Sequence, residues 1–157
     1  MSTAPERVVR AAAAAGMRIA SAESLTAGMV AAELGTVPGA SAVLQGGVVA
    51  YQNSVKEQVL GVSGTLLAAA GSVDGRVAEE MAAGVRRLLN ADFGVSTTGV
   101  AGPEPHDGEP VGTVFIGVAG PAGTRSREFR FTGDRASIRL QACAAALDLL
   151  AGELGAR

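Results

Sequence analysis

The chain has 157 residues, enough for one domain with a sizeable core. Its 13 basic and 15 acidic residues give a formal net charge of −2 and only 3 % of its residues are aromatic, which argues against a nucleic-acid partner held by basic patches or base stacking. The single cysteine excludes an internal disulfide and no apolar run is long enough to span a membrane, so we expect a cytoplasmic protein.

Helical and extended patterns alternate along the chain, which predicts a layered α/β domain. In chain order we expect a helix over 5–15, a strand from 17, a helix over 25–34, an extended segment over 41–52, a short helix after 53, another over 65–70, a helix after 74, a strand over 91–99, a β-hairpin through 120–123 and a helix over 134–152. The apolar 48 % is mostly Ala, Val, Leu and Ile, which suits close packing of helices on a sheet.

Several residues mark the ends of these elements. Gly16 suits a left-handed helix end, and Asp74 is a good N-cap because its side chain can accept a hydrogen bond from a free backbone N–H. Asn53 or Ser54 is expected to cap the helix that carries Lys56. The pair at 46–47, two glycines, indicates a bulge or a close backbone approach.

Ser24 and Lys56 are the candidate chemical groups. A serine hydroxyl is protonated at neutral pH, so it needs a base, and a lysine can serve only where burial or positive charge lowers its pKa. At a strand-to-helix junction, free helix N–H groups near Ser24 could also stabilise an oxyanion. The simpler alternatives are that Ser24 or Thr26 only caps a helix and that Lys56 is an ordinary surface lysine. Cys143 lies in an apolar helical pattern and is expected to be a buried thiol.

Three motifs occur in an order that resembles the C-terminal domain of the CinA family, the nicotinamide-nucleotide amidohydrolases. AESLTAG is similar to the family's AESCTGG, VVAYQNSVKEQVLGV to V-x-Y-x-N-x-x-K-x-x-x-L-G-V, and TTGVAGP to S/T-G-x-A-G-P. The resemblance covers residues 5–152 but not the N-terminal domain of longer members. It implies a single three-layer α/β/α domain with a mixed sheet over 1–157, and hydrolysis of nicotinamide mononucleotide to nicotinate mononucleotide and ammonia.

The resemblance also implies site residues. Ser24 and Lys56 match the catalytic dyad, and Tyr51 matches a residue that could position the base. The expected substrate contacts are Thr26, Gly28, Thr98, Gly99, Ala101, Gly102, Arg135 and Arg139, with one of the two arginines facing the phosphate. We expect no metal or other cofactor, a small nucleotide as the partner, and neither nucleic acid nor membrane. The sequence is compatible with a homo-oligomer as well as with a monomer.

The chain departs from the family pattern at several positions. Leu25 replaces a cysteine, and Ala27 replaces a glycine and adds a methyl group that could narrow the pocket. The EPHDGE segment over 104–109 replaces a glycine-rich stretch, and Glu109 reverses a charge; a metal site at His106 and Asp107 is not expected. The alternative is therefore that this protein is a catalytically weak member of the family and binds a nucleotide or a partner.

Overall fold

The computed structural model describes residues 1–155 and contains one mixed sheet of five strands in the order β2-β1-β3-β4-β5. The strands are β1 (Ile19–Glu23), β2 (Leu44–Val49), β3 (Phe93–Gly99), β4 (Thr113–Gly120) and β5 (Gly123–Arg130). Strand β1 runs parallel to β2 and β3, whereas β4 and β5 are antiparallel to their neighbours. The carboxyl ends of the three parallel strands therefore lie along one edge of the sheet.

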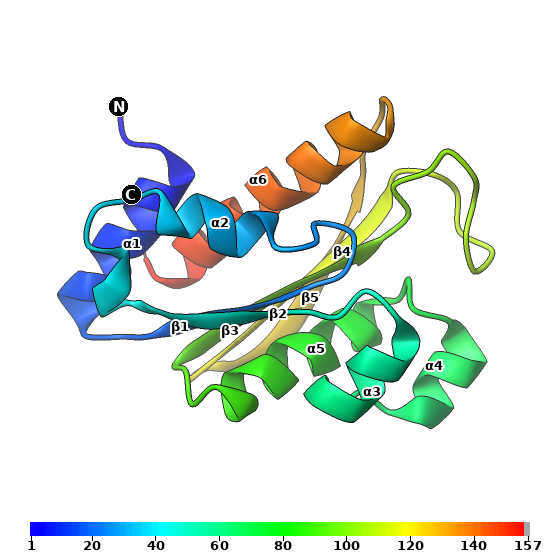
Figure 1. The fold of residues 1–157 in the computed structure, drawn as a ribbon, viewed down its shortest axis with the longest axis horizontal. Helices are drawn as coiled ribbons and strands as arrows, with labels where there is room; N and C mark the ends of the chain where they lie inside the picture. Colours follow the sequence, from blue (N-terminus) through cyan, green and yellow to red (C-terminus); the bar gives the residue numbers. More distant parts are fainter. Residues whose placement is uncertain (156–157) are drawn as a thin grey trace.

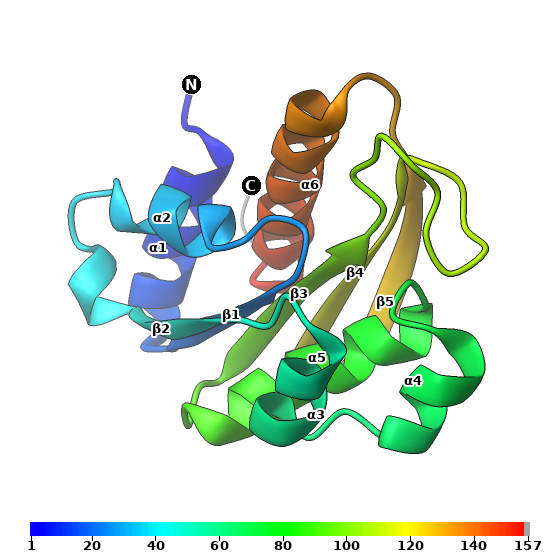
Figure 2. The ribbon, with the colours of Figure 1, turned by 45° about the vertical axis from the view of Figure 1, so that its right-hand side comes forward.

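Helices cover both faces of this sheet (Figure 1). The helices are α1 (Ala4–Ala15), α2 (Met29–Gly35), α3 (Asn53–Leu60), α4 (Gly64–Ala70), α5 (Gly75–Leu88) and α6 (Arg135–Glu153), with a 3₁₀ turn at Ala40–Ala42. Figure 2 shows α1, α2 and α6 on one face and α3, α4 and α5 on the other. The expected three-layer α/β/α arrangement with a mixed sheet is confirmed; the last two residues of the expected domain, 156–157, lie outside the described residues.

Local signals mark several ends correctly. Gly16 ends α1 at φ 65°, and the side chains of Asp74 and Asp134 accept backbone hydrogen bonds at the starts of α5 and α6. The expected cap of α3 is wrong: Gln52 occupies that position, and its side chain makes no capping hydrogen bond. Asn53 is instead the first residue of the helix.

The segment 25–28 is a turn and not the first part of a helix. Ala27 has φ 48° and Gly28 has φ 99°, and these left-handed conformations interrupt the helical path. Helix α2 therefore begins at Met29, with Gly28 as its N-cap. The spacing of apolar residues continued through this turn because Leu25 is buried in the same core cluster as Val30.

Small residues allow close packing, as expected from the composition. A Cβ on Gly94 would lie 2.2 Å from the carbonyl oxygen of Ala82, and one on Gly117 would lie 2.3 Å from that of Ala78. Helix α5 thus rests directly on the backbone of β3 and β4. Strand β2 has the expected irregularity, since its register with β1 shifts and a Cβ on Gly47 would lie 2.6 Å from Ser21 Oγ.

Candidate active site

The three predicted motifs meet at the carboxyl ends of the parallel strands. Ser24 follows β1, Lys56 lies in the first turn of α3 after β2, and the 97–102 segment ends β3. The chain leaves β1 over one face through α2 and reaches β3 over the other face through α3, α4 and α5. In open α/β sheets, such a switch point opens a crevice at the strand ends, where ligands bind.

Ser24 and Lys56 are in direct contact. Lys56 Nζ donates a hydrogen bond to Ser24 Oγ at 3.1 Å and another to the backbone oxygen of Tyr51 at 3.0 Å. The side chain of Lys56 is 1 % exposed. Burial lowers its pKa to about 8, although the negative charge of Asp107 acts in the opposite direction. This is the environment that a lysine base requires.

The position of Lys56 on its helix explains its burial. Lys56 and Leu60 are the buried residues of α3, four positions apart on one face of the helix. The ammonium group therefore enters the protein along the stripe that anchors the helix. In the sequence, Lys56 stands four positions before the apolar Leu60, a spacing that places both on one face of a helix and indicates burial. The alternative of a surface lysine did not take this spacing into account.

A buried carboxylate organises the turn that carries Ser24. Glu23 Oε1 accepts hydrogen bonds from Thr26 Oγ1 at 2.7 Å and from the Val30 amide at 2.8 Å. Its Oε2 accepts bonds from Ser21 Oγ and the Ala31 amide, both at 3.1 Å. The first N–H groups of α2 are thus occupied by Glu23, so the expectation of free helix N–H groups for an oxyanion is wrong. Sequence reasoning missed Glu23, although it directly precedes the serine.

Residues at the end of β3 hold the serine backbone. The Ser24 amide donates to the Thr97 backbone oxygen at 3.0 Å and approaches Thr97 Oγ1 at 3.3 Å. Thr97 Oγ1 also lies 2.8 Å from Thr26 Oγ1. Neither Ser24 nor Thr26 caps α2, because the N-cap is Gly28. Thr97 was absent from the expected site residues.

A pocket of about 310 Å³ opens beside Ser24. It is lined by Ser24, Leu25, Tyr51, Ser72, Arg135 and the segment 99–106. Of the expected substrate contacts, Gly99, Ala101, Gly102 and Arg135 are in this lining. Another hollow of about 370 Å³, at Phe93 and the turn 120–125, contains neither residue of the dyad. We therefore take the pocket at Ser24 as the candidate active site.

The other four expected contacts lie behind the pocket wall. Thr26 is fully buried against Glu23 and Thr97, and Gly28 is the N-cap of α2. Thr98 Oγ1 donates to the Ser72 backbone oxygen at 2.7 Å, and Arg139 Nε donates to the Leu25 backbone oxygen at 2.8 Å. These residues support the wall and are not among those that line the pocket.

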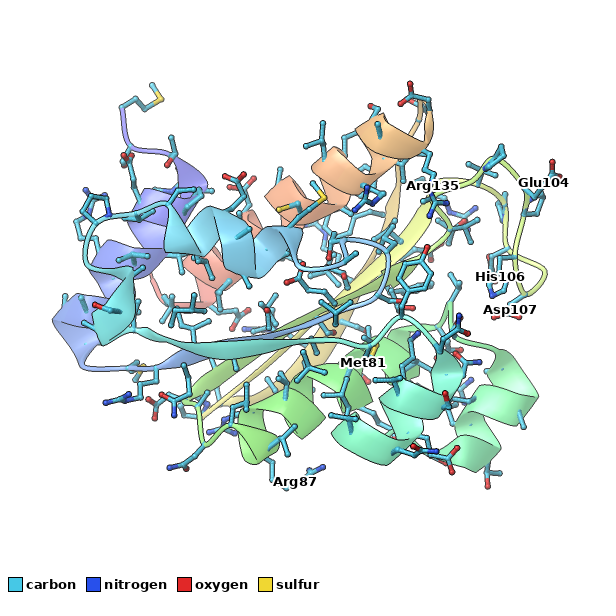
Figure 3. All side chains as sticks on the ribbon, viewed as in Figure 1. Met81, Arg87, Glu104, His106, Asp107 and Arg135 are labelled. Carbon is cyan, nitrogen blue, oxygen red and sulfur yellow. The ribbon has the colours of Figure 1, made fainter. Side chains whose placement is uncertain are left out.

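Tyr51 and Arg135 meet at the pocket mouth. Arg135 Nη2 donates to the Tyr51 hydroxyl at 2.7 Å, and Nη1 donates to the Gly102 backbone oxygen at 2.6 Å. Arg135 thereby joins the start of α6 to both sides of the pocket, next to the loop that carries Glu104 and His106 (Figure 3). Tyr51 contacts Lys56 through its backbone oxygen, whereas its hydroxyl faces Arg135.

Residue counts give a further signal that the motifs did not use. The sequence contains one lysine among its 13 basic residues, one tyrosine and one histidine. These are Lys56, Tyr51 and His106. Tyr51 and His106 line the pocket, and Lys56 contacts Ser24. Three residue types that the rest of the chain does without are therefore gathered at one place.

The departures from the family pattern fall in different places. Leu25 is buried and lines the pocket, whereas Ala27 is exposed and is not among the lining residues, so its methyl group does not narrow the pocket as expected. The segment 103–106 forms one wall, and Glu109 lies outside the lining.

Among the described residues, no three His, Cys, Asp or Glu side chains form a group that could hold a metal ion. No helix within 1–155 has the length and apolar character of a membrane span.

Comparison with known proteins identifies the family to which this chain is similar. Residues 1–154 match the family model described as the CinA C-terminal domain. A CinA-like protein from Frankia casuarinae is 54 % identical over 132 residues, which cover 84 % of this chain and 30 % of that protein. A CinA-like protein from Anaeromyxobacter sp. is 54 % identical over 147 residues, which cover 93 % of this chain and 36 % of that protein. The chain thus spans about a third of the length of these curated relatives.

Solved structures show the same fold. A CinA superfamily protein from Klebsiella pneumoniae matches with a TM-score of 0.93 and 35 % identity over 97 % of this chain and 96 % of that one. The competence/damage inducible protein CihA from Agrobacterium tumefaciens matches with a TM-score of 0.88 and 32 % identity over 99 % and 98 %. By sequence and by structure, this chain belongs to the CinA family and corresponds to its C-terminal domain.

Proposed function

We propose that this protein hydrolyses the carboxamide of nicotinamide mononucleotide, giving nicotinate mononucleotide and ammonia. The observation that carries the proposal is the buried amine of Lys56, hydrogen-bonded to Ser24 Oγ at 3.1 Å beside a pocket. A pKa of about 8 leaves roughly one amine in ten unprotonated at pH 7. An ordinary lysine would supply less than about one in a thousand.

The chemical steps follow from the dyad. Lys56 Nζ takes the proton of Ser24 Oγ as that oxygen attacks the carboxamide carbon, forming a tetrahedral intermediate. The lysine then gives the proton to the departing nitrogen, and ammonia leaves an acyl-enzyme. Water attacks the ester carbon with Lys56 again accepting a proton; the bond to Ser24 Oγ breaks, and the serine regains its proton.

Backbone groups are the candidate donors for the oxyanion. The N–H groups at the start of α2 are bound to Glu23, which removes them from this role. Leu25 and the 99–102 segment line the pocket beside Ser24. The Val100 N–H is bonded to the Thr113 backbone oxygen, so the backbone N–H groups of Leu25, Ala101 and Gly102 would stabilise the negative oxygen of the tetrahedral intermediate.

Arg135 is the better candidate for the substrate phosphate. It lines the pocket, and its planar group presents several donors that suit a phosphate. Arg139 has its Nε committed to the Leu25 backbone oxygen. Binding of a phosphate would compete with the present bonds from Arg135 to Tyr51 and Gly102.

The test is ammonia release from nicotinamide mononucleotide, with nicotinate mononucleotide identified as the second product. Ser24→Ala and Lys56→Met should each lose nearly all activity, whereas Ser54→Ala, which changes an exposed serine on α3, should keep it. Full activity in Ser24→Ala would reject the dyad. A wild-type protein that binds the nucleotide and releases no ammonia would support the binding-only alternative.

A further inference from the structure

The loop 103–110 is fastened to the linker between α4 and α5 through one carboxylate. Asp107 Oδ2 accepts hydrogen bonds from the Ser72 amide at 2.9 Å and from Ser72 Oγ at 3.1 Å. Gly71 leaves room for this contact, since a Cβ there would lie 2.7 Å from Asp107 Cβ. The loop therefore packs closely on a complementary part of the backbone.

This contact builds one wall of the candidate active site. Ser72 and the segment 103–106 both line the pocket, and the Ser72 backbone oxygen accepts the Thr98 hydroxyl from the end of β3. Figure 3 shows Asp107 at the tip of the loop, next to His106. Backbone bonds of 3.2 and 2.9 Å between His106 and Glu109 close the tip into a tight turn. Asp107 thus connects a compact loop to the strand that supports Ser24.

The carboxylate of Asp107 also acts on the dyad through its charge. Hydrogen bonds from Ser72 lower the pKa of Asp107, and the charges of His106 and Lys56 lower it further, so this group is ionised at neutral pH. Its negative charge raises the pKa of Lys56 against the larger effect of burial. The loop also carries Glu104, His106 and Glu109, and the linker carries Asp74. The other charged or titratable groups around the dyad and the linker are Glu23, Tyr51 and Arg135, with Glu57 on α3 and Arg76, Glu79, Glu80, Arg86 and Arg87 on α5.

We propose that Asp107 is a positioning residue of this site: its carboxylate fastens the loop 103–110 to Ser72 and so holds it as a wall of the pocket. The effect on catalysis rests on the function proposed above, but the fastening and the charge effect do not. Asp107 belongs to the EPHDGE segment over 104–109, so this departure from the family pattern has a role at the site.

The charge effect can be measured without a substrate. Lys56 is the only lysine in the chain, so ¹⁵N-lysine labelling gives a single Nζ signal whose pH titration reports on this residue alone. Asp107→Asn removes the charge, keeps an oxygen that Ser72 can donate to, and tolerates the left-handed backbone at φ 51°. We expect its titration midpoint to fall by several tenths of a pH unit below the wild-type value. The matched control Glu109→Gln, on the same loop, should leave the midpoint in place; a wild-type midpoint in Asp107→Asn would overturn the charge effect.

The fastening needs a second variant and a second measurement. Asp107→Gly removes the carboxylate without strain at positive φ, and hydrogen exchange of the Ser72 amide reports on the lost bond. We expect exchange to become at least about tenfold faster in Asp107→Gly and to stay near wild type in Asp107→Asn. Equal exchange in all three proteins would overturn the fastening.

Kinetics with nicotinamide mononucleotide then connect both effects to catalysis. Asp107→Gly should raise KM, whereas Asp107→Asn should keep KM and move the acid limb of the kcat profile to lower pH. An unchanged KM in Asp107→Gly would overturn the role of the loop as a pocket wall. If the wild-type protein releases no ammonia, the proposed function fails, while the titration and the exchange experiment still decide whether Asp107 acts as stated.

Discussion

Thr26 Oγ1 and Thr97 Oγ1 lie 2.8 Å apart and join the turn after β1 to the end of β3. Both side chains are fully buried, and the Ser24 amide also approaches the Thr97 hydroxyl. The nucleophile is therefore held by two neighbouring strands at once. This arrangement fixes Ser24 Oγ relative to Lys56, which lies on helix α3 after β2, the strand on the other side of β1.

Thr97→Val tests this support. Valine has nearly the shape of threonine but leaves the hydroxyl of Thr26 without this partner, so we expect a loss of about 1 to 2 kcal/mol in the free energy of unfolding and a several-fold lower kcat. Urea denaturation and steady-state kinetics measure the two effects. Thr65→Val, an exposed position on α4, is the matched control and should change little; wild-type values in Thr97→Val would contradict the support role.

Glu23→Gln should be more harmful. The amide would present a donor to part of a cluster in which Glu23 now accepts four hydrogen bonds from Ser21, Thr26, Val30 and Ala31. We expect the free energy of unfolding to fall by about 2 to 3 kcal/mol, because a buried donor then faces another donor. Thermal and urea unfolding give the measurement. Glu33→Gln, on the exposed side of α2, should remain within about 0.5 kcal/mol of wild type.

The pH dependence of kcat should follow Lys56. Because the neutral amine is the base, activity should rise with pH and level off above about 8, the pKa of Lys56. Lys56→Arg should show no such rise, since a guanidinium stays protonated. A wild-type profile that is flat over roughly three pH units around this pKa, from pH 6 to pH 9, would contradict lysine as the base.

Lys56→Met should lose activity yet gain stability. Burial lowers the folded-state pKa of Lys56 from 10.5 to about 8, so below pH 8 the native protein carries a buried ammonium group. Between about 8 and 10.5 the unfolded chain binds more protons than the native protein, and the stability of the wild type should rise with pH through this window. Lys56→Met lacks this rise and should be about 1 to 2 kcal/mol more stable at pH 7. Urea denaturation at pH 7 and at pH 10, one below and one above the Lys56 pKa of about 8, tests both statements.

The two arginines of α6 should respond differently. Arg135→Ala removes a pocket cation, so KM for the nucleotide should rise about tenfold or more with a smaller effect on kcat. Arg139→Ala removes the bond to the Leu25 backbone oxygen and should lower the free energy of unfolding by about 1 kcal/mol. Kinetics and denaturation of the pair separate the roles. A larger KM increase in Arg139→Ala would reverse our assignment of the phosphate contact.

Local chemistry made much of the fold predictable. Gly16, Asp74 and Asp134 act through their own neighbours in the chain, and the alternation of helices and strands led to the correct three-layer architecture. The turn at 25–28 was not predictable in this way. Its conformation depends on positive φ at Ala27, which is rare for alanine, and on the Glu23 carboxylate that holds the first turn of α2.

The site depended on contacts between distant parts of the chain. Lys56 lies 32 residues after Ser24, and only the motif resemblance brought them together before the structure did. Arg139 contacts Leu25 across 114 residues, so nothing near α6 indicated that it supports a wall. The Asp107 contact with Ser72 depends on the fold of a loop that differs from the family pattern.

The antiparallel pairing of β4 with β3 places the turn between β4 and β5 at the end of the sheet opposite the pocket. Gly99 pairs with Val114 near the pocket, whereas Gly94 pairs with Ala119 at the other end of the two strands. The exposed turn at Pro121 and Ala122, which follows Ala119, therefore lies at the end of the sheet away from the pocket. Exposed turn tips with small residues tolerate inserted sequence. A tag or a surface tether placed in that turn would immobilise the protein with its pocket facing away from the support.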